Sequence, residues 1–285
     1  MSTSIAPSPA AVPTVISTKA GTGKVTLAHV VNAEWIKFRT LRSTYYTLLA
    51  VVVADIGIGI ASCYGAVDRI QHPRHEGPGR FLQDFSPAEW SLQGYNLAQL
   101  ALGVLGVLIV TGEYSTGMIR ASLSAVPRRL PMLWAKAAVF GVVAAVLSCV
   151  CVLTSFFVGQ SILSTVHVQT TISAPGVSRV VFGTALYLTV VGLLSVALGT
   201  MIRNAAGGIA TLLGVLFIVP LLVEGLPTTW HDHIAPYLPS AAGSAVMTLK
   251  QDPTLLSPGT GLLVLAVYLV VAYLGAAVVL KRRDA

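Results

Sequence analysis

The sequence has very little charge. Only 10% of its 285 residues are charged, whereas soluble globular domains carry roughly 25%. Hydrophobic residues make up 54% of the chain, and the mean hydropathy is +0.78. So few charges cannot cover the surface of a water-soluble fold of this length, and a largely disordered chain would be polar and highly charged. The composition therefore predicts an integral membrane protein.

Cysteine is scarce as well, which excludes a disulfide scaffold. The three cysteines, Cys63, Cys149 and Cys151, all fall inside apolar runs, where they are expected to act as small buried hydrophobes. The His231-Asp232-His233 sequence offers two metal-ligand types spaced by one residue, which is a weak signal for a metal. We predict a surface cluster there and no metal site.

The first 25 residues lack the apolar core of a secretory signal and are rich in Ser, Thr, Pro and Ala. We predict a disordered cytoplasmic tail over residues 1–25. Its Gly21-Thr22-Gly23-Lys24 sequence resembles the end of a phosphate-binding loop, but Thr18 and Val25 stand where that motif needs a glycine and a hydroxyl residue. We expect no nucleotide or other cofactor to bind this chain, and hence no enzyme activity of its own.

Long apolar runs define the fold, since about 20 apolar residues are needed for a helix to cross a bilayer. Six runs qualify, and they predict an all-α protein with six transmembrane helices in one membrane domain spanning residues 43–285. Only Arg203 and Asn204 separate the fourth run from the fifth, which predicts a tight hairpin. The runs cover residues 43–66, 92–112, 135–160, 180–202, 205–223 and 260–280.

Basic residues give the expected orientation, because lysine and arginine favour cytoplasmic loops. With six spans, thirteen lysine and arginine residues fall on the side of the two termini and five fall on the other side. Both termini are therefore expected in the cytoplasm, with the loops near 67–91, 161–179 and 224–259 outside. The net charge of +7 thus reflects topology, and we expect contacts with membrane lipids but not with nucleic acid.

The spacing of apolar residues over 26–42 predicts an amphipathic helix that lies in the membrane interface, with Trp35 at headgroup depth. Glu34 interrupts its apolar face. Two interpretations stay open for Glu34: snorkelling or a pair with Lys37 three residues on, or a contact with another helix or protein. The residues of the apolar face are Leu27, Val30, Val31, Trp35, Phe38 and Leu41.

Asp55 is the one clear charge in the middle of a span. An ionisable group at membrane depth normally faces a cavity or a partner. Asp55 is therefore a candidate for the substrate pathway, and the alternative is a structural hydrogen bond to a neighbouring helix.

Several motifs then carry a family resemblance. The run GEYSTGMIRASLSAVPRR, from Gly112 to Arg129, resembles the signature of actinobacterial permeases of the type 2 ATP-binding-cassette (ABC) transporter family. Further stretches match at family spacing, so that the resemblance covers residues 27–285. These stretches are NAEWIKFRTLRSTYYTLL, SLQGYNLAQLALGVLGVLIVTGEYS, IRNAAGGIA, YLPSAAG and LKRRDA.

The resemblance implies a permease subunit of an ATP-driven exporter in the bacterial plasma membrane, moving an amphipathic or hydrophobic substrate. Such a subunit pairs with a second copy or a paralogue, and each half binds a separate ABC ATPase subunit. A short coupling helix at residues 115–123 would rest on the ATPase together with the amphipathic helix, and residues 234–249 would form external or re-entrant helices. The implied coupling residues are Glu34, Trp35, Lys37, Arg39, Glu113, Ser115, Met118, Ile119 and Arg120.

Other functions remain open. Arg120, Arg128 and Arg129 could merely hold their loop inside and touch acidic lipid. A secondary carrier or channel would use Asp55 as a coupling charge. An intramembrane hydrolase would need a nucleophile and a base within the spans, and no histidine lies deep in an apolar run.

Overall fold

A computed structural model describes residues 26–40, 42–72, 77–118, 129–250 and 256–282. Within these ranges the chain forms helices and no strands, as the sequence predicts. The expected disorder of residues 1–25 lies outside the described residues.

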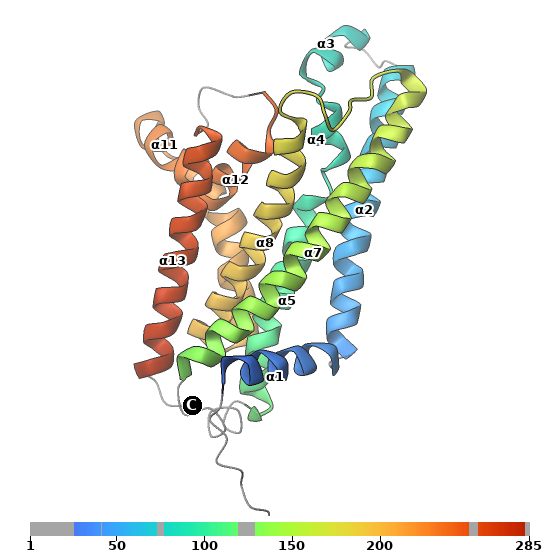
Figure 1. Ribbon diagram of the computed structural model, residues 1–285. Coiled ribbons are helices and arrows are strands. Elements are labelled where there is room, and N and C mark those ends of the chain that lie inside the picture. Colours follow the sequence, from blue (N-terminus) through green and yellow to red (C-terminus); the bar gives the residue numbers. More distant parts are fainter. Residues whose placement is uncertain (1–25, 41, 73–76, 119–128, 251–255, 283–285) are drawn as a thin grey trace, which may run out of the picture.

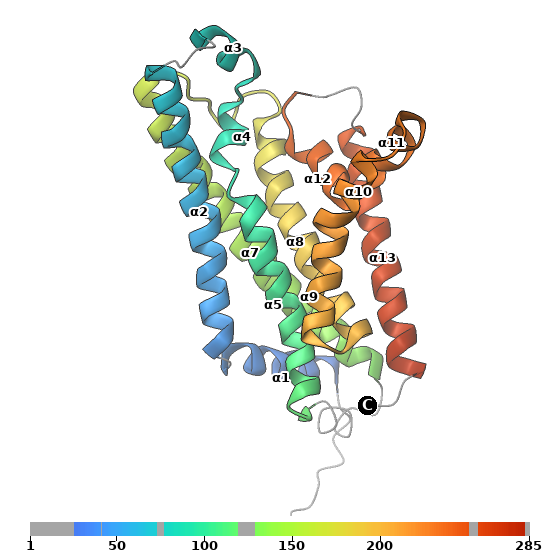
Figure 2. The ribbon, with the colours of Figure 1, turned by 180° about the vertical axis from the view of Figure 1, so that it is seen from behind.

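In the ranges that the structure describes, six helical segments are long and apolar enough to cross a membrane, which confirms the six predicted spans. They stand side by side in one bundle (Figures 1 and 2). The fifth span consists of three consecutive helical segments, α9, η2 and α10. The bounds are α2 (Arg42–Gln71), α5 (Tyr95–Ser115), α7 (Arg129–Leu163), α8 (Val177–Ile202), α9 (Ala205–Leu213), η2 (Gly214–Ile218), α10 (Val219–Glu224) and α13 (Pro258–Arg282).

Helix α8 forms the centre of the bundle. In its most apolar stretch of 18 residues, 78% of the residues are buried, against 17% in the corresponding stretch of α13. Glycines let its neighbours approach closely, as small residues do in membrane helices. A methyl group at Gly192 would meet the rings and side chains of Phe140 and Leu102, and one at Gly199 would meet the backbone of Val107. Helices α5 and α7 therefore pack directly on α8.

A short helix, α1 (Leu27–Thr40), lies across one end of the bundle, under α5 and α7 (Figure 1). We call this end the α1 end. The last turn of α13 lies at the same end, as does the α8–α9 hairpin (Figures 1 and 2). The hairpin is as tight as predicted: Arg203 has a left-handed backbone with φ 60°, and the Asn204 side chain caps α9 by accepting the Gly207 N–H at 2.9 Å.

The opposite end carries the shorter helices (Figure 2). Helix α12 is largely buried there, and Arg179 of α8 donates to the Ala245 and Val246 carbonyl oxygens near its last turn, each at 3.3 Å. Residues 234–249, expected to form external or re-entrant helices, thus form η3 and α12. The remaining short elements are α3 (Gly77–Asp84), α4 (Pro87–Ser91), η1 (Ser164–Val166), α11 (Thr228–Ile234), η3 (Ala235–Tyr237) and α12 (Pro239–Met247).

The second span differs from its predicted bounds. The apolar run from residue 92 predicts a helix from that point, but α4 ends at Ser91 and α5 begins at Tyr95. Non-helical backbone at membrane depth is tolerated where protein buries it and supplies its hydrogen bonds. Here α7 supplies them: the Ser155 hydroxyl donates to the Ser91 carbonyl oxygen at 2.7 Å, and the Gln160 amide donates to the Pro87 carbonyl oxygen at 3.0 Å.

Candidate functional site

Helix α1 turns a charged residue, not only its apolar face, toward the bundle. Val30 and Glu34 are buried, whereas Trp35 is exposed. The predicted apolar face is therefore only partly right: Val31 and Phe38 are half-buried, but Leu27 and Trp35 point away from the bundle. Glu34 is buried because it forms ion pairs with lysines beside it on α1 and on the bundle.

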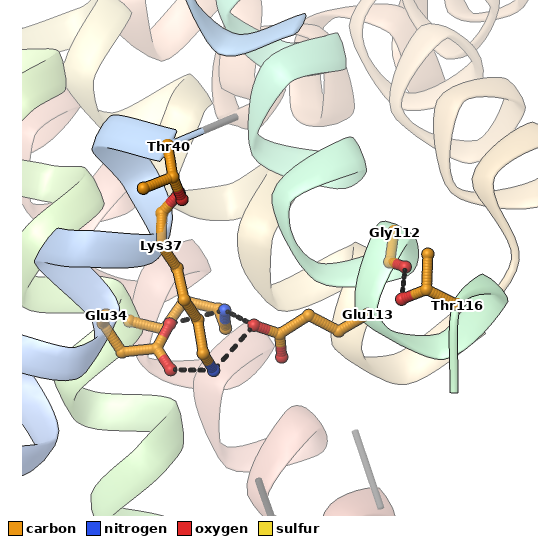
Figure 3. Close-up of polar contacts among 7 residues, drawn as sticks. Glu34, Lys37, Thr40, Gly112, Glu113 and Thr116 are labelled. Carbon is orange, nitrogen blue, oxygen red and sulfur yellow. Dashed lines mark hydrogen bonds and ion pairs between the residues drawn. The ribbon is translucent and has the colours of Figure 1, made fainter. Parts of the chain in front are cut away.

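Four charged side chains from three helices meet where α1 crosses α5 and α7 (Figure 3). Lys37 Nζ donates to Glu34 Oε1 at 2.8 Å and to Glu113 Oε1 at 3.1 Å. Lys136 Nζ donates to Glu34 Oε2 at 2.7 Å and to Glu113 Oε1 at 2.9 Å. Each lysine thus bridges both carboxylates. We call Glu34, Lys37, Glu113 and Lys136 the ion cluster.

The ion cluster is largely enclosed. The side chains of Glu34, Lys136 and Glu113 are 5 to 7% exposed, and that of Lys37 is 27% exposed. Two positive and two negative charges leave no net charge, which is the condition under which buried ions are tolerated. Glu113 Oε2 is buried and accepts no hydrogen bond from the described residues. The cluster therefore holds the three helices together only while all its members are charged and in place.

The electrostatics of α1 follow from these contacts. Burial acts to raise the pKa of Glu34, but the charges and hydrogen bonds of Lys136 and Lys37 outweigh it, so the pKa lies below its ordinary value of 4.5. Burial acts to lower the pKa of Lys37, but its contacts with Glu34 and Glu113 outweigh it, so the pKa lies above 10.5. Both residues are ionised at neutral pH.

Helix α5 ends through local hydrogen bonds and the backbone conformation of a glycine just after it. The Ser115 and Thr116 hydroxyls donate to the Gly112 carbonyl oxygen at 3.0 and 2.8 Å, and Gly117 takes a left-handed backbone with φ 71° that ends the helix. Met118 follows with 45% of its surface exposed. Of the predicted coupling helix at 115–123, Ser115 is the last residue of α5 and Thr116 and Gly117 form a turn, whereas Ile119, Arg120 and the rest lie outside the described residues.

A cavity of about 340 Å³ lies beside the ion cluster, between α1, α5 and α7. Glu34, Lys37, Glu113 and Lys136 form part of its lining. Its remaining wall is mostly apolar and includes Phe38, Leu108, Ile109, Met118, Val139 and Phe140. The structure therefore brings together Glu34, Lys37, Glu113, Ser115 and Met118 of the predicted coupling residues around one hollow.

Two predicted coupling residues lie apart from the ion cluster. Trp35 and Arg39 are exposed on α1, where Trp35 stacks on Phe38 with ring centroids 6.4 Å apart. Glu34 pairs with Lys37 and also contacts another helix through Lys136, so the pair and the helix contact are both present, whereas snorkelling is wrong because the side chain is buried. The sequence did not single out Lys136; its position as a lone charge near the start of a long apolar run is the signal that could have done so.

Asp55 is separate from the ion cluster, about 20 Å along α2 from Arg42 at 1.5 Å per residue. Its side chain is fully buried, and neither carboxylate oxygen has a hydrogen-bond partner among the described residues. The alternative of a structural hydrogen bond from this carboxylate to a neighbouring helix is therefore wrong for the part of the chain that the structure describes.

Nothing in the described ranges resembles a metal centre, since no three His, Cys, Asp or Glu side chains gather there. The His231-Asp232-His233 sequence lies on α11. His231 Nδ1 is 3.1 Å from Asp232 Oδ1, and His233 Nδ1 is 2.7 Å from the Thr229 carbonyl oxygen.

The fold defines a multi-pass, α-helical membrane protein with a buried ion cluster at one end. No known protein family matches the chain, and a comparison with curated proteins finds no match either.

Proposed function

We propose that this protein is the transmembrane permease subunit of an ATP-driven exporter, and that a separate ATPase subunit delivers the work at the α1 end. The chain lacks a complete phosphate-binding loop, so ATP would bind to the partner. The resemblance of residues 27–285 to type 2 ABC permeases supports the same function.

The observation that carries the proposal is the ion cluster. It joins α1, which lies across the end of the bundle, to the end of α5 and the start of α7. A force applied to α1 or to the loop after Met118 would therefore reach two spans through the three charge-assisted hydrogen bonds that join different helices. Loss of one partner from a buried ion pair is costly, so the four side chains are expected to move as a unit.

In this function eight of the nine coupling residues divide into two roles, and the ninth, Ser115, donates to the Gly112 carbonyl oxygen at the end of α5. Glu34, Lys37 and Glu113 contact Lys136 or one another, so they position α1 and α5. Trp35 and Met118 are 41% and 45% exposed and are available to a partner. We propose that these two side chains, with Arg39, Ile119 and Arg120 beside them, form the surface that the ATPase contacts.

The remaining features of the proposal follow from the topology. The α1 end is cytoplasmic, since the basic residues gather there, and η3 and α12 form the external re-entrant structure. A second copy or a paralogue completes the transport path for an amphipathic or hydrophobic substrate in the bacterial plasma membrane. The exposed apolar surfaces of the outer helices face lipid or that second subunit.

The test is purification of the tagged full-length chain from the cell that makes it, followed by measurement of ATP hydrolysis. We expect a subunit with a complete phosphate-binding loop to co-purify, and hydrolysis to require it. Trp35→Ala should reduce the amount of this subunit. Tyr237→Ala, which removes an equally exposed aromatic ring at the opposite end, should not.

Hydrolysis by the homogeneous chain alone would contradict the proposal. Equal recovery of the ATPase with Trp35→Ala and with wild type would instead place the docking surface elsewhere.

One observation favours a second candidate, a secondary carrier. Asp55 is a fully buried carboxyl group without a partner among the described residues, and carriers place such groups at membrane depth. Transport by the chain alone, driven only by an ion gradient across a vesicle membrane, would favour the carrier over the ATP-driven permease.

A further inference from the structure

The side chain of Asp55 has no environment that would stabilise a negative charge. It is 0% exposed, and both carboxylate oxygens lack a hydrogen-bond donor among the described residues. An isolated carboxylate is strongly destabilised when it is taken out of water into an apolar medium, so such a group takes up a proton instead of remaining charged.

The neighbouring elements supply no counter-charge. Helix α2 packs against α1, α3, α4, α5, α7 and η1. The cationic side chains described on these elements are at the α1 end, where Lys37 and Lys136 bind Glu34 and Glu113. The other ionisable side chains described on these elements are His29, Arg39, Asp84, Glu89, Tyr95, Tyr114, Cys149 and Cys151, and those described on α2 itself are Tyr45, Tyr46, Cys63, Tyr64, Asp68 and Arg69. Among the described residues, none of them forms a hydrogen bond with the Asp55 carboxylate.

Asp55 also lies at the break between α4 and α5. A methyl group at Gly94 would overlap the backbone of Asp55, so this turn rests directly on α2. On the other side, Ser155 of α7 donates to the Ser91 carbonyl oxygen at 2.7 Å and reaches the Asp55 carbonyl oxygen at 3.5 Å. The backbone of Asp55 thus lies where three segments meet, one of them an interrupted helix, and its side chain is buried among them.

We propose that Asp55 is a proton-binding site, with its carboxyl group protonated in this conformation. A proton is the ligand that fits, because a fully enclosed side chain leaves no room for anything larger. Release of the proton requires water to reach the carboxyl group, which means separation of α2 from the helices packed on it. Proton release and this opening favour each other, because coupling between two equilibria is reciprocal.

This inference does not rest on the proposed function. An ATP-driven permease and an ion-driven carrier could each contain such a site, and the experiments below use neither ATP nor a substrate.

The first experiment is infrared spectroscopy of the full-length protein in lipid at about pH 6, where an exposed aspartate is already ionised. The difference between wild type and Asp55→Asn should contain the C=O stretching band of a protonated carboxyl group. The control is Asp84→Asn, because the Asp84 side chain is 84% exposed. Its difference spectrum should lack that band. A wild-type spectrum without the band would overturn the proposal.

The second experiment compares the stability of wild type and Asp55→Asn as pH rises. The folded wild type keeps a proton that the unfolded chain releases above about pH 4, so its folding equilibrium should weaken about tenfold per pH unit relative to Asp55→Asn. This trend should continue until the folded protein also releases the proton. Asp84→Asn should show no such trend.

The infrared band and the pH dependence of stability can each contradict the proposal. A stability difference that is constant with pH, or that favours wild type more strongly as pH rises, would mean that Asp55 is ionised and paired. If Asp55→Asn does not fold, the loss of the band from wild type on raising the pH still tests the site. A band that never titrates would contradict proton exchange.

Discussion

Replacement of Lys136 by methionine tests the ion cluster most sharply. Methionine keeps the length and flexibility of the side chain but removes its charge. Glu34 and Glu113 would then share Lys37 alone, and Glu34 Oε2 would lose its 2.7 Å hydrogen bond. Removal of one partner from a buried ion pair costs about 3 to 5 kcal/mol, because the other charge stays buried without compensation.

The matched control is Lys281→Met, the same substitution at an exposed position in the last turn of α13. A surface change of this kind alters the free energy of unfolding by about 0.5 kcal/mol or less. The assay is denaturant or thermal unfolding of the purified chain in one detergent. The deficit of Lys136→Met should shrink on acidification toward the ordinary pKa of Glu34 at 4.5, because a protonated Glu34 no longer needs the lysine.

A double-mutant cycle identifies the contact responsible. Glu34→Gln combined with Lys136→Met should cost less than the sum of the two single changes, since each single change leaves a buried charge unpaired. Additive costs would show that Glu34 and Lys136 do not interact. A Lys136→Met protein as stable as Lys281→Met would refute the ion cluster as a stabilising unit.

Three further predictions concern the α1 end. Glu34 has a lowered pKa and Lys37 a raised one, so the stability that they contribute is present between about pH 5 and pH 10. Unfolding measurements should show this stability being lost as the pH falls through the pKa of Glu34, and also as the pH rises through the pKa of Lys37. Met118→Ala with Ile119→Ala should reduce recovery of the ATPase subunit, with membrane insertion unchanged; full recovery would contradict an apolar contact there. In a cysteine-free background, Thr116→Cys should resist an impermeant maleimide in intact cells but react in inverted vesicles, and the reverse would overturn the orientation.

The spans could be predicted because the bilayer imposes a length and a composition on each one. The hairpin at Arg203 and Asn204 followed from the same rule, since no longer connection remained. The break between α4 and α5 could not be predicted, because it depends on Ser155 and Gln160 of a distant helix supplying hydrogen bonds to its backbone.

The ion cluster was partly predictable. Spacing alone suggested the pair between Glu34 and Lys37. The contact between Glu34 and Lys136 joins residues 102 positions apart, and helix periodicity carries no information about such distant partners. This long-range contact also fixes the rotation of α1, which explains why Trp35 is exposed although a helical wheel groups it with Val30.

ATP hydrolysis by the complex purified through this chain tests the central claim most directly. With wild type, the complex should hydrolyse ATP and the chain alone should not. With Lys136→Met, the ATPase should still bind, because Trp35 and Met118 remain. The rate of ATP hydrolysis should then no longer depend on the conformation of the transmembrane subunit. Hydrolysis by the chain alone, or transport driven by a proton gradient with no ATPase present, would contradict the account.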